Sequence, residues 1–423
     1  WPDDKSWFDD PSWYNRRGRV YLWWHESDYT REFVREQETR GDFPGGLKDL
    51  DTDNPDVQEA LIRVYQYWIE VADFDGFRID TLKHIDRPEL DPDDRGFYGE
   101  FTTRIRQHAA SLGKQNFFIF GEAFDGNDEL SGAYTFPGRD ARGEFGRVDS
   151  TFYFSQYYRV IKNVFMGGNP TTDIACMYNS RMGIQSADCA DFARGPVYWG
   201  SPHATPEQGG IGLAPQQVMV SFLDNHDVAR FLFAYQEMRG AREGALEALK
   251  NALFYLFTWD GIPCVYYGTE QAFDGGVDPG NREDMFLGNP DLGYPPFDTD
   301  NEMFQYVKGL IAMRAEREAL RRGAVSVTYA SPRSGAEQDA GVFAFERASA
   351  GDKVLVVLST SDQGERTTCA PADAGGLCMT TSFPPGTTLR DIAPGSDGAS
   401  FTVGAGGALE VTVPPRGGRV LAP

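Results

Sequence analysis

The chain is short of positive charge and of long apolar runs. Its 423 residues carry 40 lysines and arginines against 63 aspartates and glutamates, which gives a formal net charge of −23. Nucleic acids and anionic membrane surfaces would repel such a chain, so neither is expected as a partner. No run of about 18 apolar residues occurs, so no membrane-spanning helix is expected. A neutral ligand fits this charge balance best.

Cysteine is also scarce. The five cysteines form no Cys-x-x-Cys motif, so a cysteine-ligated zinc site is not expected. Cys369 and Cys378 stand close together in a Gly/Pro/Ala-rich stretch and predict a short disulfide loop. Cys176 and Cys189 are candidates for a second pair, whereas Cys264 lies in an apolar run and is expected to be a free thiol. Two disulfides would favour an exported protein.

The first residues lack the basic and apolar regions of a signal peptide, and they lack an initial Met. Residues 1–52 are aromatic, acidic and rich in turn residues. We therefore expect this stretch to be loop-rich and to continue from a segment that precedes Trp1.

Two different strand patterns follow. Residues 53–322 alternate predicted helices with short, continuously apolar strands, as in a parallel sheet that is covered on both faces. The predicted helices include one that starts with Asn54 as its N-cap and Pro55 in its first turn, and one over 301–323. The predicted strands include 76–80, 117–121 and 149–154. From residue 323 the predicted strands follow one another between Gly/Pro turns with no helix between them, which indicates an antiparallel β-sandwich over 323–423. The fold class is therefore α/β, with residues 1–52 and the sandwich as separate parts.

Three acids stand where predicted parallel strands end, namely Asp80, Glu122 and Asp227. In a parallel barrel all carboxyl ends of the strands point to one face, so these three acids are expected to meet there. One acid after a strand is often only a helix N-cap. Three acids with polar neighbours indicate a functional site more strongly.

The surroundings of the first two acids differ. Arg78 and Asp80 share one strand face, so the guanidinium is expected to keep Asp80 ionised and able to act as a nucleophile. A purely structural ion pair is the alternative. Glu122 shares its face with Phe118 and Phe120, and apolar walls favour a protonated carboxyl that can donate its proton. One charged and one protonated carboxyl is what glycosidic bond cleavage requires.

Five segments resemble, in order and spacing, those of the α-amylase family of (β/α)8-barrel glycoside hydrolases. They are "LKDLDT", "GFRIDTLKH", "FGEAF", "FLDNHD" and "GIPCVYYGTEQ". The resemblance implies a TIM-type barrel at 53–322, a remnant of an inserted domain at 1–52 and a C-terminal β-sandwich domain at 323–423. It also implies hydrolysis of α-glucosidic bonds through a covalent glycosyl-enzyme.

The resemblance assigns roles residue by residue. It makes Asp80 the nucleophile, Glu122 the general acid/base and Asp227 the carboxylate that stabilises the transition state. It implies that substrate is bound or oriented by Arg78, Lys83, His84 and His226.

The resemblance also implies bound ions. In calcium-dependent members, the carboxylate at the position of Asp49 and the backbone carbonyl at that of His84 bind Ca²⁺, and oxygen ligands suit this ion. Asn225 and Arg78 match two chloride ligands of chloride-activated members, and no third chloride ligand is evident.

One family segment, an Asp-x-x-x-Asn-His pattern on the third strand, is absent from the chain. We therefore expect only barrel strands four to eight here. The full-length protein is expected to be a secreted monomer acting on α-glucans, while this piece alone is expected to be inactive. Transglycosylation and a non-catalytic carbohydrate-binding homologue are the alternatives, and a phosphate-binding barrel is disfavoured because acids rather than bases neighbour the glycines at 265–276.

Overall fold

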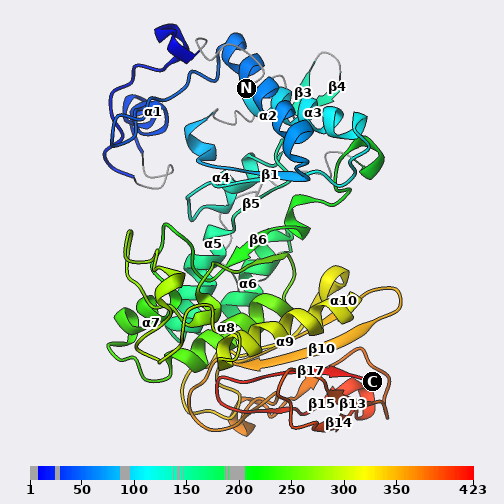
Figure 1. The fold of residues 1–423 in the computed structure, drawn as a ribbon. Helices are drawn as coiled ribbons and strands as arrows, with labels where there is room; N and C mark the ends of the chain where they lie inside the picture. The colour runs from blue at the N-terminus through cyan, green and yellow to red at the C-terminus, as the bar shows by residue number, and fades with distance from the viewer. Residues whose placement is uncertain are drawn as a thin grey trace. The chain divides into compact units, whose positions relative to one another are not determined.

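The computed structural model describes residues 8–23, 29–85, 96–136, 138–140, 143–145, 147–184, 186, 189 and 205–423 (Figure 1). The chain forms two compact units. The first unit comprises Trp1–Ser155, Arg181–Gly183 and Arg194–Val220, and the second comprises Gln156–Ser180, Ile184–Ala193 and Ser221–Pro423. The second unit therefore takes in part of the predicted barrel together with the C-terminal strands.

Helix α2 (Pro55–Ala72) of the first unit starts at the cap residues that the sequence predicts. The Asn54 side chain accepts a hydrogen bond from the Asp56 amide at 2.9 Å, and Pro55 occupies the first turn, where it costs no hydrogen bond. The helix ends at Asp73, whose backbone is left-handed. Its buried face, with Ile62 and Ile69, enters the core of the unit.

The first unit is built on three parallel strands in the order β1 (Gly76–Ile79), β2 (Phe118–Gly121) and β5 (Ser150–Thr151). Ile79 pairs with Gly121, so β1 and β2 end side by side. A further parallel bridge joins Phe152 to Val220. Helices α2 and α3 (Gly96–Ser111) contribute to the same buried core as β1 and β2, as expected for a βαβ arrangement.

Smaller elements complete the first unit. They are α1 (Glu32–Arg40), α4 (Asp128–Ala133), the hairpin of β3 (Gly138–Asp140) and β4 (Gly143–Phe145), and short 3₁₀ turns at Pro11–Trp13, Leu82–His84, Pro206–Gln208 and Pro215–Gln217. The prediction did not include α1 or α4. The strand predicted at 149–154 shrinks to the two residues of β5.

A short strand pair is formed by β6 (Val220–Phe222) and β7 (Ile262–Cys264), and all of it except Val220 belongs to the second unit. A short segment, α5 (Phe154–Gln156), leads into a π-helix over Tyr157–Met166. The remaining helices are α6 (Thr172–Arg181), α7 (Phe231–Arg239), α8 (Ala245–Thr258), α9 (Glu302–Glu316) and α10 (Glu318–Arg322), with 3₁₀ turns at Thr269–Gln271 and Met285–Leu287.

The single helix predicted over 301–323 is in fact two helices. Arg317, between α9 and α10, has extended backbone angles. Its guanidinium contacts the Asp352 carboxylate, which also accepts a hydrogen bond from the Ala319 amide at 3.0 Å. A tertiary contact therefore caps the new helix, and no propensity in the sequence reveals it.

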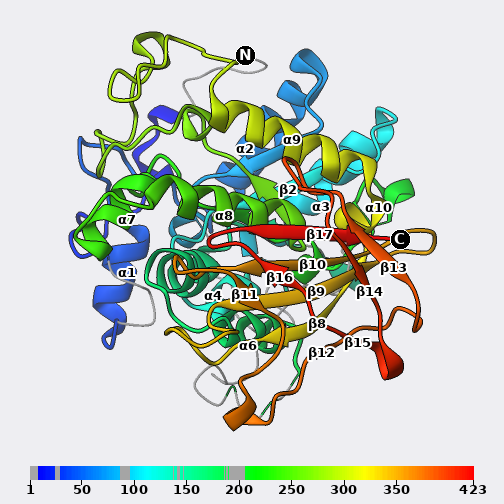
Figure 2. The ribbon, with the colours of Figure 1, turned by 90° about the horizontal axis from the view of Figure 1, so that it is seen from below.

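The C-terminal strands form the predicted antiparallel architecture (Figure 2). Six strands lie in the order β14 (Ser400–Thr402), β13 (Thr388–Asp391), β17 (Gly418–Ala422), β10 (Lys353–Ser359), β9 (Val342–Ala348) and β8 (Ala324–Ala330). The second layer is reduced to two short ladders, β11 (Arg366–Thr367) with β16 (Thr412–Val413) and β12 (Met379–Thr380) with β15 (Ala408–Leu409). A 3₁₀ turn occupies Ala372–Ala374 and another Ala405–Gly407.

The central strands of this sheet are buried on both faces, which explains their unbroken apolar runs. On one face, Leu355 and Val357 pack in a core with Leu409 and Val413 of the short ladders. On the other, Phe345 meets the ring of Trp259 edge-to-face at 4.8 Å, just after α8. Both layers are therefore needed to cover the sheet.

The cysteine predictions are confirmed. Cys176 is bonded to Cys189 and Cys369 to Cys378, while Cys264 is free. Among the described helices, none is both long enough and apolar enough to cross a lipid bilayer.

Candidate active site

Arg78 links the two acids that follow β1 and β2. One of its terminal nitrogens contacts the Asp80 carboxylate, and the other contacts the Glu122 carboxylate. The backbone joins the same two strand ends, because Glu122 donates to the Ile79 carbonyl at 2.9 Å and accepts from the Leu82 amide at 2.7 Å. Parallel pairing thus brings together residues that are 44 positions apart.

The two acids differ in access to solvent. The Glu122 side chain is only 8% exposed, whereas that of Asp80 is 64% exposed. Asp80 can therefore be reached by a ligand, while the Glu122 side chain is nearly buried. Arg78 is also within 5.7 Å of the Phe152 ring centroid, so its guanidinium is held between an aromatic face and the two carboxylates.

The surroundings of Glu122 are less apolar than predicted. Phe118 and Phe120 do stack on one another, with ring centroids 5.4 Å apart. However, the Arg78 guanidinium contacts the Glu122 carboxylate, and a guanidinium favours the charged form of its partner. The apolar neighbours predicted for Glu122 are present, and the parallel register of β1 and β2 adds the Arg78 side chain beside them.

A strained turn leads from Asp80 to Lys83. Thr81 has a positive φ of 51°, an unusual conformation for a β-branched residue. Lys83 follows in a 3₁₀ turn and is buried, donating to the Phe124 carbonyl at 2.9 Å and lying 4.0 Å from the Asp125 carboxylate. Lys83 thus supports the segment that follows Glu122, and its predicted contact with substrate stays a prediction.

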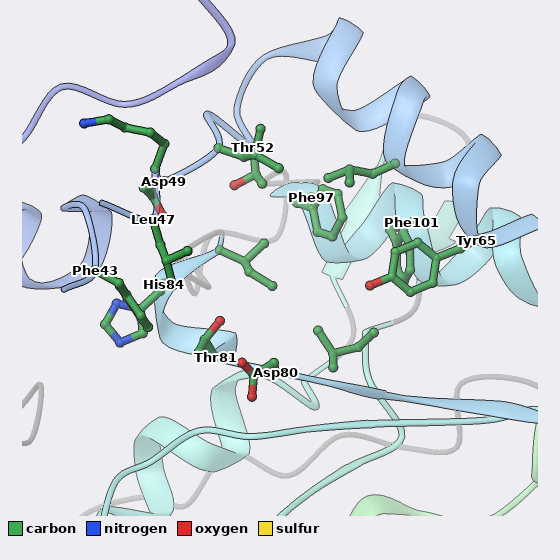
Figure 3. A pocket seen from close by; sticks show the side chains of 15 residues that line it. Phe43, Leu47, Asp49, Thr52, Tyr65, Asp80, Thr81, His84, Phe97 and Phe101 are labelled. Carbon is green, nitrogen blue, oxygen red and sulfur yellow. The ribbon is translucent and has the colours of Figure 1, made fainter. Parts of the chain in front are cut away.

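A pocket of about 360 Å³ opens beside Asp80 within the first unit (Figure 3). Asp80 and Thr81 lie together on one side of it, and the remaining lining is largely apolar. The other labelled lining residues are Phe43, Leu47, Asp49, Thr52, Tyr65, His84, Phe97 and Phe101. Half of these eight residues, namely Phe43, Tyr65, Phe97 and Phe101, lie outside the five segments named in the sequence analysis.

His84 forms part of the pocket wall as a neutral ring. Burial, followed by the nearby Lys83 charge, lowers the pKa of His84 to about 3. Its ring meets Phe43 edge-to-face at 4.8 Å and lies 6.1 Å from Trp23. The Nδ1 atom is buried without a hydrogen-bond partner, so it is the polar atom of this wall left for a ligand or water.

The predicted calcium ligands line this same pocket. Asn15 donates to the Asp49 carboxylate at 2.7 Å, and burial raises the pKa of Asp49 to about 7. A half-buried carboxylate of this kind is stabilised by a cation, and the oxygen donors of Asp49 and His84 fit Ca²⁺ in kind. Among the described residues, however, no cluster of three acidic, histidine or cysteine ligands includes Asp49.

Asp227 belongs to the second unit, where its own neighbours orient it. Its backbone amide donates to the Asn225 side chain at 2.8 Å, which fixes the turn after β6. The carboxylate lies 3.1 Å from His226 Nε2 and 3.4 Å from an Arg282 nitrogen. Arg282 also donates to the His226 carbonyl at 3.2 Å, so these three side chains form one group that is open to solvent.

Beneath this group lies a buried network that the sequence analysis missed. Arg230 is fully buried, pairs with Glu283 at 2.9 Å and lies 4.0 Å from the Tyr266 ring centroid. Asp224 accepts from the Phe231 amide at 3.1 Å and from the Thr269 hydroxyl at 3.0 Å. The paired charges hold the loops around Asp227 from below, and the "DVAR" and "NRED" segments were the available signal.

The structure thus assembles the predicted site in two groups. Arg78 contacts Asp80 and Glu122 in the first unit, and Lys83 is buried against the segment that follows Glu122. His226 and Asp227 are in contact in the second unit. The two residues matched to chloride ligands, Arg78 and Asn225, are divided between the units, and Arg78 is engaged by carboxylates.

The family model "Alpha amylase, catalytic domain" matches residues 4–154 and 212–286. These ranges cover more than half of the chain and contain all three candidate acids. The chain belongs to the α-amylase family.

Curated relatives agree with this assignment. The chain is 30% identical over 434 residues to an alpha-amylase of Streptomyces lividans, covering 98% of the chain and 39% of that protein. It is 25% identical to a cyclomaltodextrinase of Bacillus sp. and 26% identical to a cyclomaltodextrin glucanotransferase of Klebsiella oxytoca, covering 79% and 75% of the chain. The chain spans less than half the length of each of these three relatives, at 39%, 48% and 43%.

Solved structures show the same fold. An α-amylase of Anoxybacillus matches with a TM-score of 0.67 at 23% identity, covering 99% of this chain and 72% of that one. An α-amylase of Geobacillus thermoleovorans, solved with acarbose, matches with a TM-score of 0.66 at 20% identity, covering 99% and 74%. The predicted fold class, a (β/α)8-type barrel with a C-terminal antiparallel domain, is confirmed.

Proposed function

We propose that this chain carries the acids of a retaining hydrolase of α-glucosidic bonds, acting on starch-like α-glucans or maltooligosaccharides. The contact of one guanidinium with both the Asp80 and Glu122 carboxylates is the observation that carries the proposal. Two carboxylates bound to one planar group lie close to each other. Retaining glycosidases hold their carboxyl groups about 5–5.5 Å apart, and inverting ones about 6.5–9.5 Å.

The two acids have different catalytic roles, in keeping with their different exposure to solvent. Asp80 is open to the pocket and attacks the anomeric carbon, forming a covalent glycosyl-enzyme, while the glycosidic oxygen leaves with the proton of Glu122. Water then attacks the intermediate, and Glu122 takes its proton. Arg78 holds both carboxylates in place, and its positive charge offsets theirs whether or not Glu122 carries a proton.

Asp227 and His226, which lie in the second unit, are given the sugar-binding roles that the family resemblance implies. The Asp227 carboxylate stabilises positive charge on the ring in the transition state, and His226 donates to sugar hydroxyls. Their mutual contact at 3.1 Å and the Arg282 contact fix the carboxylate before substrate arrives. A preformed site avoids the cost of ordering these side chains during the reaction.

Transglycosylation is the second candidate, and it is favoured by the likeness to cyclomaltodextrin glucanotransferases. It uses the same covalent intermediate and differs only in the acceptor, a sugar hydroxyl in place of water. The length of the products separates the two reactions. Hydrolysis gives only shorter oligosaccharides, whereas transfer also gives longer or cyclic ones.

Calcium and an extracellular location are further parts of the proposal. Ca²⁺ would be held by the Asp49 carboxylate and the His84 carbonyl, where it would supply structural stabilisation of the loops beside the pocket. The two disulfides support export, because such bonds persist in oxidising compartments. The proposed partner is a neutral α-glucan, in keeping with the net charge of −23, and the full-length protein is proposed to act as a monomer.

The test uses the full-length protein that contains this chain, called the full chain below, which is incubated with maltoheptaose before the products are separated by length. We expect shorter maltooligosaccharides from the wild type and a loss of roughly 10²–10⁴-fold in Glu122→Gln, with at least as large a loss in Asp80→Asn. Glu365→Gln and Asp373→Asn remove exposed acids between the C-terminal strands and are the matched controls. Equal activity in all five proteins would contradict the proposal.

A further inference from the structure

Two phenylalanines in the second unit are displayed to solvent. Phe286 is 74% exposed and Phe297 is 53% exposed, yet their rings touch edge-to-face with centroids 5.0 Å apart and planes at 80°. Leu287, beside Phe286, is 73% exposed. We call Phe286 and Phe297 the aromatic pair. Exposing such a pair forgoes the burial that aromatic side chains normally gain on folding.

The backbone beneath the aromatic pair is strained and firmly held. Phe297 has a φ of 54°, which is a conformational outlier for a bulky residue. The carbonyl of the next residue, Asp298, accepts hydrogen bonds from the side-chain amides of Gln271 at 2.9 Å and Asn301 at 2.7 Å. Both amide side chains are buried. The positive φ of Phe297 costs about 1–3 kcal/mol of folding free energy, and these hydrogen bonds keep the residue in that conformation with its ring exposed.

The backbone at Phe286 is also fixed by a hydrogen bond. Asp284 caps the 3₁₀ turn Met285–Leu287 by accepting from the Phe286 amide at 2.9 Å. Four residues earlier, Arg282 contacts the Asp227 carboxylate. Four residues of chain span at most about 14 Å, so Phe286 stands within reach of a short oligosaccharide bound at Asp227.

We propose that the aromatic pair is a stacking platform for glucosyl units of an α-glucan, extending the sugar site outward from Asp227. This inference rests on the proposed function and adds to it which residues make the enzyme prefer long substrates. A glucosyl ring has an apolar face of C–H groups and a rim of hydroxyls. The two rings offer a face and an edge, and the half-exposed Arg282 side chain offers donors to hydroxyls. A neutral sugar also avoids repulsion from this acidic protein.

The platform affects how tightly substrates of different length are bound. A short maltooligosaccharide that occupies only the sites around the acids does not reach it, while a longer one does. The aromatic pair therefore lowers KM for long substrates and leaves kcat nearly unchanged, because stacking binds ground state and transition state alike.

The experiment compares the full-chain wild type with Phe286→Ala/Phe297→Asn, using maltotriose and maltoheptaose. Asn tolerates a positive φ, so this variant is expected to keep or raise the thermal midpoint. We expect KM for maltoheptaose to rise about tenfold, with kcat within twofold and maltotriose kinetics unchanged. Phe286→Trp keeps a stacking face and is expected to retain the wild-type KM. Leu377→Ala, which removes another exposed apolar side chain, is the control.

The outcomes separate this inference from the proposed function. If the wild type cleaves maltoheptaose and the double variant shows the same KM, the platform is wrong while the proposed function stands. If the wild type neither binds nor cleaves any maltooligosaccharide, both fail. If the double variant instead converts a dimer into a monomer on light scattering with unchanged KM, the pair is an interface between copies and the platform is overturned.

Discussion

Arg78, at the end of β1, contacts Glu122, which follows β2 44 residues later, and it does so while also contacting Asp80. One side chain thus couples an exposed carboxylate to a buried one. Lysine has a single compact charge and cannot bind both carboxylates with a planar fork. The spacing of the two acids therefore depends on Arg78.

The first prediction concerns that dependence. Arg78→Lys is expected to lower kcat/KM for maltoheptaose roughly 100-fold, because a small misplacement of the reacting groups is costly. Steady-state kinetics on the full chain measures it. Arg322→Lys, an exposed arginine on α10, is the matched control. A change of less than twofold in Arg78→Lys would show that the bridging contact has no catalytic role.

The second prediction separates the roles of the two acids by chemical rescue. Asp80→Gly with sodium azide is expected to release a β-glycosyl azide, because azide replaces the missing nucleophile and inverts the anomeric carbon once. Glu122→Ala with azide and a substrate carrying a good leaving group is expected to give the α-glycosyl azide, since the covalent intermediate still forms. Proton NMR identifies the products, and an exchange of the two outcomes would reverse the assignment.

The third prediction tests the proposed calcium ligand. Saturating Ca²⁺, at about 100 times its dissociation constant, would stabilise the folded wild type by about 2.7 kcal/mol relative to a chelator-treated sample. Asp49→Asn is expected to lose most of this gain, and Asp373→Asn to keep it. Thermal unfolding monitored by circular dichroism, with and without chelator, provides the readout. An equal calcium response in all three proteins would exclude Asp49 as a ligand.

The fourth prediction concerns the Glu59 contact between α2 and α3. Hydrogen bonding from Arg104 lowers the pKa of Glu59 below its ordinary value of 4.5. A lowered pKa means that the stabilisation is present above the unfolded value and is lost as pH falls through the folded one. Glu59→Gln is therefore expected to be less stable than the wild type at pH 7, and the difference is expected to shrink as the pH falls below 4.5. Denaturant titrations at pH 7 and at pH 3 check this, and a difference as large at pH 3 as at pH 7 would contradict it.

Much of the fold follows from residue patterns. Helix α2 starts at Asn54–Pro55 as predicted, and the strands predicted at 76–80 and 117–121 appear at 76–79 and 118–121. The break at Arg317 was not predicted because a distant carboxylate, Asp352, causes it. The ladder strands β11 and β12 were also missed, because two residues are too few to show the alternation of a strand.

The candidate site was predictable in its residues and less so in its contacts. The acids at the strand ends and the Arg78–Asp80 pair follow from strand periodicity. The Arg78–Glu122 contact depends on the register between β1 and β2, and the burial of Lys83 depends on the loop after Glu122. Neither the Arg78–Glu122 contact nor the burial of Lys83 can be predicted from the neighbouring residues in the sequence. The aromatic pair was missed because exposed phenylalanines look like core residues in composition.

The stereochemistry of the first product tests the central claim most directly. The full chain is mixed with an aryl α-maltooligoside, and proton NMR follows the anomeric signals before mutarotation mixes them. Because Asp80 attacks first and water second, the account predicts that the α-anomer appears first. Initial release of the β-anomer would contradict a covalent intermediate on Asp80.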